Sequence, residues 1–486
     1  MSTLDSEYFN NKHQNLFNSK YRRVRSGKFS RNRHWKNLIV LSLTFLFCFT
    51  AYGAIQNIQS SVNTSNGLGF LSLTIVYGSL MLSSLLAPAV LKYFGTKWTI
   101  VFATLCYCIY SYANFFPLYA TLIPSSFLLG FSAAPLWVAQ GTYLTTSAIQ
   151  LAELINEVPE FVISRFNGVL FALIQTNQIW GNLLSFTILD AGMEDQRPTN
   201  VSSCGSQSCG APIESNPPSQ GKNEVQLLFC IFSVIGMLAV LLSVCFLDEQ
   251  PSATTQIKAD TGSFLSMVLS TVRLMSNFQL FLLIPVFVYT GTEQAFMFGD
   301  FTKSYITCTQ GISAVGLVMI AYGVSAVISS LICGQLEKIT GRIFLFCLGS
   351  VVHAGLLVYL YVWKPNQQAE WQLYLVAVGW GVGDAVFQTQ CASIIGVFFA
   401  GCQEPAFSNY RFWQSAGYCI SFVLSIPDGI CIFHKIIGIG IWLLFSMITY
   451  FVCEYKISSY RCFVTGMSST RVDRQQQQAV TCNTVL

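Results

Sequence analysis

Two carboxylic acids, Glu293 and Asp384, lie inside long apolar stretches of this chain, where charged side chains are rare. A charge at the centre of a bilayer costs at least about 2.5 kcal/mol without a partner. No Lys or Arg falls at that depth in the same stretches. Each acid is therefore expected to be protonated, hydrated in a cavity or neutralised by a cation. We predict that Glu293 works through its proton or a bound cation rather than through packing.

Amide side chains accompany the acids at helical spacing, so that each set falls on one helix face. The sets are Tyr52, Gln56 and Gln59; Gln175, Gln178 and Asn182; and Asp384, Gln388 and Cys391. The amides either contact a ligand or form interhelical hydrogen bonds of about 0.6–2 kcal/mol each, and both interpretations stay open. The candidate cavity residues are Gln56, Gln140, Gln178, Glu293, Asp384 and Gln388. His353 is expected to be a hydrogen-bonded packing residue.

Twelve apolar stretches must position these side chains. A helix needs about 20 apolar residues to cross a bilayer. The stretches are 37–59, 67–92, 96–116, 118–146, 164–190, 225–247, 277–302, 310–336, 341–363, 370–400, 405–427 and 434–455. Hydrophobic residues form 53% of the 486 and charged residues only 10%, which is unusual for a soluble protein. We predict an all-α membrane protein with twelve transmembrane helices.

The basic residues predict the orientation, because cytoplasmic loops are enriched in Lys and Arg. With both termini in the cytoplasm, all but five of the 26 basic residues are cytoplasmic. The sequons at Asn63 and Asn200 then lie outside, and at least one is expected to carry a glycan. Cys204 and Cys209 also lie outside, where they form either a local disulfide or two free thiols. The polar tails, 1–36 and 456–486, are expected to be disordered and cytoplasmic.

The sequence contains an internal repeat. Tyr77-Gly-SLMLSSLLAPAVLKYFGTK and Tyr322-Gly-VSAVISSLICGQLEKITGR share a YG start, an SSL motif and a basic loop with Gly, at an offset of about half the chain. A six-helix half repeated in one orientation is the layout of major facilitator transporters. We expect six-helix bundles at 37–247 and 277–455, joined by a cytoplasmic linker at 248–276.

The second basic loop resembles the short signature that major facilitator proteins carry between helices 2 and 3 and again between 8 and 9. In that signature a Gly permits close helix approach, and an acid and bases hold neighbouring helix ends together. Arg411 is the expected partner of Glu337, whereas the first copy lacks the acid. The alternative is that these charges are only topology signals. The candidate latch residues are Gly95, Lys97, Gly334, Leu336, Glu337, Lys338, Gly341, Arg342 and Arg411.

Several motifs together resemble the uncoordinated-ninety-three family, nearest to its homolog A branch. They are Gln56-Asn-Ile-Gln59-Ser-Ser, Trp137-Val-Ala-Gln140-Gly141-Thr-Tyr143, Gln178-Ile-Trp180-Gly181-Asn182, Gly291-Thr-Glu293-Gln-Ala-Phe296-Met-Phe-Gly299-Asp300 and Asn409-Tyr-Arg411-Phe-Trp413-Gln414. The resemblance implies a major facilitator fold, no enzymatic activity, and a role as an accessory subunit of a potassium channel or a trafficking partner of membrane receptors. The fold and the acids leave a solute or proton-coupled transporter as an alternative.

Other chemistry finds no support in the sequence. No nucleotide-binding loop, zinc-ligand spacing or catalytic constellation is present, so we expect no cofactor, no metal and no enzyme. The basic N-terminal tail is expected to contact anionic lipid rather than nucleic acid. Thr484 and Leu486 form a C-terminal pattern that PDZ domains bind, and the alternative is chance. The plasma membrane is the expected location, with an endosomal membrane as the alternative.

Overall fold

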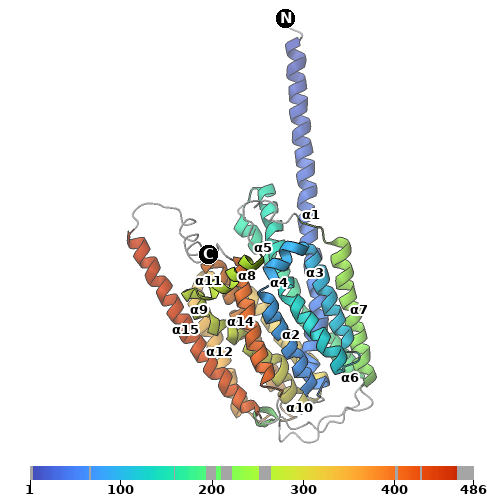
Figure 1. Cartoon of the computed structure of the whole chain (residues 1–486), viewed down its shortest axis with the longest axis vertical. Coiled ribbons are helices and arrows are strands. Elements are labelled where there is room, and N and C mark those ends of the chain that lie inside the picture. The colour runs from blue at the N-terminus through green and yellow to red at the C-terminus, as the bar shows by residue number, and fades with distance from the viewer. Residues whose placement is uncertain are drawn as a thin grey trace.

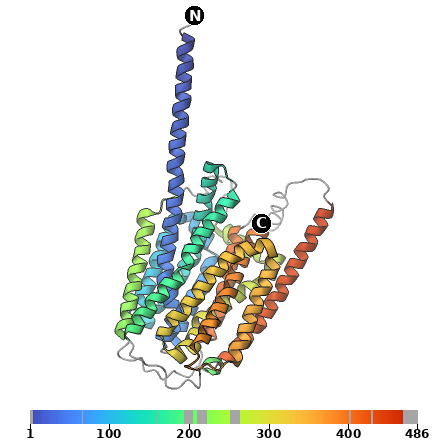
Figure 2. The same ribbon diagram turned by 180° about the vertical axis from the view of Figure 1, so that it is seen from behind.

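The structure, a computed structural model, describes residues 4–64, 67–157, 159–192, 204–209, 222–250, 264–399, 403–426 and 430–467. This part of the chain consists of helices and contains no strand. The helices run side by side between two ends of one bundle, and α1 extends well beyond it (Figure 1; from behind in Figure 2). The predicted all-helical architecture is therefore confirmed for the described residues.

The described residues of the first half form seven α-helices. They are α1 (Leu4–Val62), α2 (Leu68–Ser84), α3 (Ala87–Ala113), α4 (Tyr119–Ile155), α5 (Pro159–Gln175), α6 (Asn177–Gly192) and α7 (Lys222–Phe246). The prediction of disordered tails is wrong for most of residues 1–36, because α1 already begins at Leu4, and for residues 456–467, because α15 continues to Met467. A helix that is already formed extends more easily than a new one starts, so the tail continues the membrane helix.

The second half begins with α8 (Phe264–Met275) inside the predicted linker. It continues with α9 (Phe278–Ala295), the π-helix η4 (Phe296–Thr307), α10 (Cys308–Gln310), α11 (Ser313–Thr340), α12 (Arg342–Val362), α13 (Glu370–Phe398), α14 (Gln403–Val423) and α15 (Ile432–Met467). The short 3-10 helix η2 (Gly205–Gln207) precedes α7. Asn277 caps α9 by accepting hydrogen bonds from the backbone N–H groups of Gln279 and Leu280.

Length and apolar composition mark seven helices in the described part as able to cross a membrane. They are Arg31–Val62, Tyr119–Ile155, Asn223–Phe246, Phe278–Gln310, Ser313–Cys333, Arg342–Val362 and Ile432–Lys456. The bent pair α2 and α3 makes an eighth candidate. One predicted span, 164–190, is broken between α5 and α6. The Thr176 hydroxyl and the Asn177 amide there donate to carbonyls three residues earlier, which competes with regular helix bonding.

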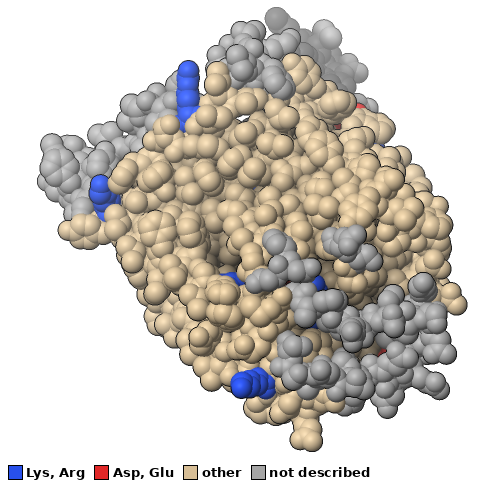
Figure 3. Space-filling model, turned by 60° about the horizontal axis from the view of Figure 1, so that its bottom comes forward, with Lys and Arg blue, Asp and Glu red and all other residues tan. Residues whose placement is uncertain are grey.

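The two ends of the bundle are named here by their contents. The linker end carries Gly95, Asp248 and Gly341, and the disulfide end carries four cysteines, Cys204, Cys209, Cys308 and Cys431. Figure 3 looks onto the disulfide end, whose visible surface is mostly uncharged with isolated basic side chains.

Matching helices of the two halves pack in matching ways. In the first half α2 packs on α4, α3 packs on α4 and α7, and α1 packs on α7. In the second half α11 packs on α13, α12 packs on α13 and α15, and α9 packs on α15. Between the halves, α2 packs on α14 and α11 packs on α6. The helices on either side of the repeated motifs thus have equivalent neighbours.

Gly95 and Gly341 stand at the repeated basic loops and share one unusual backbone conformation. Their φ angles are 72° and 80° and their ψ angles 167° and 162°. This left-handed region favours glycine because other residues clash there. A Cβ at either position would meet nothing within 4 Å. The expected role of glycine in close helix approach is therefore wrong at these two positions, where glycine instead permits the sharp turn.

Candidate functional site

Asp384 is the centre of a polar cluster between helices of the second half. Its carboxylate accepts hydrogen bonds from Tyr322 Oη on α11 (2.6 Å) and Gln294 Nε2 on α9 (2.7 Å). Gln388, one turn along α13, donates to it at 3.3 Å. Hydrogen bonds to a charged acceptor contribute about 1.5–3 kcal/mol each. The predicted pair Asp384 and Gln388 therefore lies within one cluster, which also includes Tyr322 and Gln294.

Glu293 is 0% exposed and lies beside this cluster. Trp380 Nε1 on α13 donates to its Oε2 at 2.6 Å, and the other oxygen, Oε1, has no partner among the described residues. Trp380 and Asp384 are one turn apart on α13, so both contacts lie on one helix face. Glu293 and Asp384 are close enough for their charges to interact. The two predicted acids are thus brought together.

His353 contacts Trp380, the residue that donates a hydrogen bond to Glu293. Its Nδ1 shares a 2.8 Å hydrogen bond with Tyr289 Oη, and its Nε2 lies 3.3 Å from the carbonyl oxygen of Trp380. The ring is fully buried. The prediction that His353 is a hydrogen-bonded packing residue is confirmed. It orders Trp380, the residue that donates to Glu293.

A stacked tyrosine pair joins the acid cluster to the first half of the chain. Tyr77 on α2 and Tyr418 on α14 lie face to face, with ring centroids 3.8 Å apart and planes 5° from parallel. Gln56 Nε2 donates to Tyr77 Oη at 3.0 Å. On the other side, Tyr418 Oη donates to Gln294, which in turn donates to Asp384. Gln56 therefore belongs to the same network as the acids.

The remaining candidate amides lie elsewhere. Gln178 Oε1 accepts from Asn57 Nδ2 at 3.1 Å and from Asn182 Nδ2 at 3.0 Å, which joins α1 to α6. This is the interhelical bonding that the sequence left open. Gln140 is buried in α4, and no described contact connects it to the acids.

The predicted pairing of Glu337 with Arg411 is wrong. Glu337 accepts from Ser393 Oγ at 2.9 Å and from Gln390 Nε2 at 3.5 Å, both on α13. Arg411 instead donates to Gln414 at 2.7 Å, with its guanidinium 4.9 Å from the ring centre of Trp137 on α4. Arg411 faces the first half across the interface, whereas Glu337 faces α13.

The other candidate latch residues divide between described and undescribed side chains. Arg342 pairs with Glu454 of α15 at 2.8 Å, an acid outside the signature. Lys97 lies 5.5 Å from the ring centre of its neighbour Trp98. Leu336 packs on a small apolar cluster. The surroundings of Gly334 and the side chain of Lys338 fall outside the described part. The residues Asn200, Thr484 and Leu486 also fall outside it.

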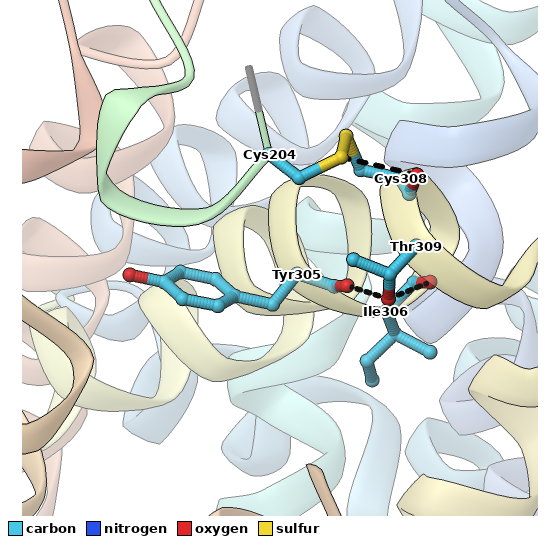
Figure 4. The surroundings of a disulfide bond; sticks show 5 residues. All are labelled: Cys204, Tyr305, Ile306, Cys308 and Thr309. Atoms are coloured by element: carbon cyan, nitrogen blue, oxygen red, sulfur yellow. Dashed lines mark hydrogen bonds between the residues drawn. A yellow bond between two sulfur atoms is a disulfide. The ribbon is translucent and has the colours of Figure 1, made fainter. Parts of the chain in front are cut away.

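Two disulfides close the disulfide end, and neither is the predicted local bridge between Cys204 and Cys209. Cys204 bonds Cys308 at the start of α10, and Cys209 bonds Cys431 just before α15. Figure 4 shows the first bridge above the end of η4, beside Tyr305 and Thr309. The local pairing is wrong because each cysteine meets a partner that is distant in sequence and adjacent in the fold.

Asn63 is a poor glycan acceptor in this structure. The residue is 6% exposed, and its Nδ2 donates to Asn114 Oδ1 at 3.4 Å. A glycan acceptor must lie on an accessible surface. The burial of Asn63 argues against a glycan there, so the prediction that at least one of the two sequons is glycosylated now depends on Asn200 and stays a prediction.

The linker end carries an ion-pair cluster around Asp248. Arg33 Nε and Lys36 Nζ of α1 donate to its carboxylate at 2.8 and 2.9 Å, and Tyr143 Oη of α4 donates to its backbone carbonyl. Burial alone would raise the pKa of Asp248. The hydrogen bonds and charges of Lys36 and Arg33 outweigh burial and lower this pKa to about 2. The cluster holds the start of the linker against α1 and α4.

Sequence reasoning missed several members of the acid network, above all Trp380, Gln294 and Tyr418. A signal existed for two others: Tyr77 and Tyr322 head the internal repeat, and each bonds the polar interior of its own half. The repeat by itself indicates architecture and does not show what the two hydroxyl groups bind. In the sequence, Trp380 and Tyr418 cannot be told from ordinary apolar ring residues. Only the fold shows where their polar atoms point.

The long apolar helices make this chain an integral membrane protein, and its helix packing has the fold of major facilitator transporters. The xylose transporter XylE from E. coli in a partially occluded inward open conformation superimposes with a TM-score of 0.60, at 12% identity, over 86% of this chain and 97% of that one. The nucleoside transporter NupG gives 0.55 at 12% identity, over 87% and 98%. These likenesses show the fold.

Residues 60–451 match the family described as "Ion channel regulatory protein UNC-93", and the chain belongs to this family. Protein unc-93 homolog A of Xenopus laevis is 39% identical over 86% of this chain and 93% of that protein. The Homo sapiens homolog A is 35% identical over 87% and 94%. A Caenorhabditis elegans relative, named "Putative potassium channel regulatory protein unc-93", is 33% identical over 86% and 60%. The family name describes a regulator rather than an enzyme.

Proposed function

We propose that this chain is a non-enzymatic regulatory subunit of a potassium channel. The observation that carries the proposal is the match of residues 60–451 to a family of ion channel regulators. The name of the C. elegans relative supports potassium as the channel's ion. The polar interior is compatible with a regulator, since its tyrosines and amides bond to one another across the helix interfaces.

We further propose twelve crossings in two six-helix bundles, 37–247 and 277–455, with a cytoplasmic linker at 248–276. The helices α2, α3, α5 with α6, α13 and α14 would supply the five crossings that the seven long apolar helices leave. The matched helix neighbours and the matched turns at Gly95 and Gly341 support a repeat. Both termini would be cytoplasmic, in the plasma membrane. Disulfides form in oxidising compartments, which supports an extracytoplasmic position for the disulfide end.

Electrophysiology tests the regulatory role. The chain is expressed with each member of a potassium-channel panel, and currents are compared with cells that express the channel alone. We expect an altered current for at least one channel and none from the chain by itself. Purification from native membrane then identifies the partner. Unchanged currents across the panel, with no channel subunit in the purified material, would reject the proposal.

A proton-coupled or solute transporter is the second candidate, because the fold is that of known transporters and Glu293 lies buried beside Asp384. Like charges this close repel, so one proton or a cation between them would stabilise the pair. The test is flux into vesicles that contain only this protein, measured from pH 5 to 8. Glu293→Gln keeps the shape and can still accept from Trp380. If it transports, or modulates its channel, like the parent at every pH, the acid is structural.

A further inference from the structure

Residues 204–209 form a short clip between two helices of the second half. One disulfide joins Cys204 to Cys308, directly after η4, and the other joins Cys209 to Cys431, directly before α15. A segment of this length spans at most about 18 Å when fully extended. The outer end of η4 therefore cannot move away from the start of α15 beyond the reach of the clip.

The clip is seated closely rather than tethered loosely. Gly205 has φ 78°, and a Cβ there would lie 2.6 Å from Pro365 Cδ and 3.2 Å from Tyr305 Cε1. The backbone N–H of Ile432 donates to the carbonyl oxygen of Ser208 at 2.9 Å. Both the left-handed backbone and the lack of space require glycine at 205. The close fit at Gly205 and the hydrogen bond to Ile432 hold the clip against the ends of η4 and α15.

The helix that the clip holds is the π-helix η4, twelve residues long. π-helical segments are rare and are usually limited to a single turn. Here other contacts support the segment from the side. Asp300 of η4 pairs with Lys435 of α15 at 2.8 Å, and these side chains are only 5% and 9% exposed. The buried ion pair therefore joins η4 to α15 a second time, in addition to the two disulfides of the clip.

The helix η4 also forms part of the contact between the two halves. Ser60 Oγ of α1 donates to the carbonyl oxygen of Gly299 at 3.1 Å, and Ser61 shares a 2.9 Å hydrogen bond with Thr307. A Cβ on Gly299 would lie 2.8 Å from the Phe70 ring and 2.9 Å from the Phe422 ring. Both η4 and these rings would have to separate before a passage could open at the disulfide end.

We propose that the clip is a covalent lock. It fixes the outer end of η4 on α15 of the same half, so η4 cannot swing away from α1 and the Phe70–Phe422 pair by itself while both disulfides are intact. A carrier that alternates between two openings must release this contact. The lock blocks the route in which η4 alone would move to release it. The inference concerns the gate alone and holds whichever channel the protein contacts.

Cys419 is a natural reporter for this gate. It lies on α14 at the interface with α2, with its Sγ 3.9 Å from the carbonyl oxygen of Thr74 and 3.7 Å from where a Cβ on Gly78 would be. Phe422, which closes the contact, follows three residues later on the same helix. The full-length protein in intact cells is treated with a membrane-impermeant maleimide, and modification of Cys419 is followed by mass spectrometry.

We expect slow modification of Cys419 in the parent. Cys204→Ser with Cys308→Ser, and separately Cys209→Ser with Cys431→Ser, should accelerate it about tenfold or more, because labelling follows the population of the open state. The control replaces Cys230 and Cys245, exposed free cysteines of α7, by Ser and should leave the rate unchanged.

A second perturbation covers the case in which the paired variants do not reach the cell surface. The folded parent is reduced with a membrane-impermeant phosphine, which converts each disulfide to two thiols while the phosphine is oxidised, and the maleimide follows. Gly205→Val, which unseats the clip and keeps all four sulfurs, should also accelerate labelling. Equal Cys419 rates in the parent, the reduced parent and every variant that reaches the surface would overturn the lock.

Discussion

Gly291 on α9 and Gly417 on α14 mark the closest approach of two helices that carry the acid network. A Cβ on Gly291 would lie 1.9 Å from the carbonyl oxygen of Gln414, and one on Gly417 would lie 2.1 Å from that of Val288. We predict that Gly291→Ala destabilises the protein, because backbone contact at this point leaves no room for a methyl group. The same separation would stretch the bonds between Gln414 and its neighbours.

The geometry gives the magnitude. A carbon normally stays about 3.5 Å from a neighbouring heavy atom, so the helices must separate by roughly 1.5 Å or bend. Overpacking of this kind costs about 1–3 kcal/mol. Gly355 on α12 is the matched control, because a Cβ there meets nothing within 4 Å. Gly355→Ala should be neutral or gain up to about 1 kcal/mol from helix propensity. The two variants should therefore differ by about 1–4 kcal/mol.

Thermal unfolding in one detergent, followed by the loss of monodisperse protein, measures this difference. We expect the midpoint of Gly291→Ala to fall several degrees below the parent, and that of Gly355→Ala to equal or exceed it. Gly417→Ala should behave like Gly291→Ala, because it tests the same contact from the other helix. Equal midpoints for Gly291→Ala and Gly355→Ala would show that α9 and α14 are not in backbone contact there.

Three further predictions concern Asp248, the sequons and the C-terminal residues. Asp248→Asn should lower stability at neutral pH by about 1 kcal/mol, since its partners are largely exposed. The depressed pKa of Asp248, about 2, means that this contribution is complete above about pH 4 and is lost as pH falls towards 2, so the unfolding midpoints of parent and variant should converge there. Glycosidase treatment should change the gel mobility of the parent and of Asn63→Gln but not of Asn200→Gln; a shift that depends on Asn63 would contradict its burial. A peptide of the last ten residues should bind a PDZ domain and lose binding with Leu486→Ala. Binding that does not depend on the terminal Leu would contradict this prediction.

The helical architecture could be predicted because apolar length and glycine-containing loops are local properties. The interruption near Gly95 falls between the predicted spans ending at 92 and starting at 96. The π-helix η4 could not be predicted, because its apolar composition also fits an ordinary α-helix and its contacts with α1 and α15 appear only in the fold. The helix at 4–36 could not be predicted because its polar composition does not reveal that it continues into a membrane helix.

The acids of the site could be predicted because a carboxyl group in an apolar stretch is costly wherever it points. Their partners could not. Trp380 and Tyr418 are apolar by composition, and only the fold turns their polar atoms towards Glu293 and Gln294. The disulfide partners could not be predicted for a similar reason. Nearness in sequence favoured Cys204 with Cys209, whereas the actual partners lie 104 and 222 residues away along the chain.

The two disulfides give the polypeptide the covalent topology of a ring. The halves are joined once by the peptide chain through residues 248–276 and again by sulfur, because Cys204 and Cys209 belong to one half and Cys308 and Cys431 to the other. A single cut in the linker would therefore leave one covalent molecule. A chain nicked by an engineered protease site at 251–263 should migrate as one species in denaturing gels without reductant, and as two fragments with it.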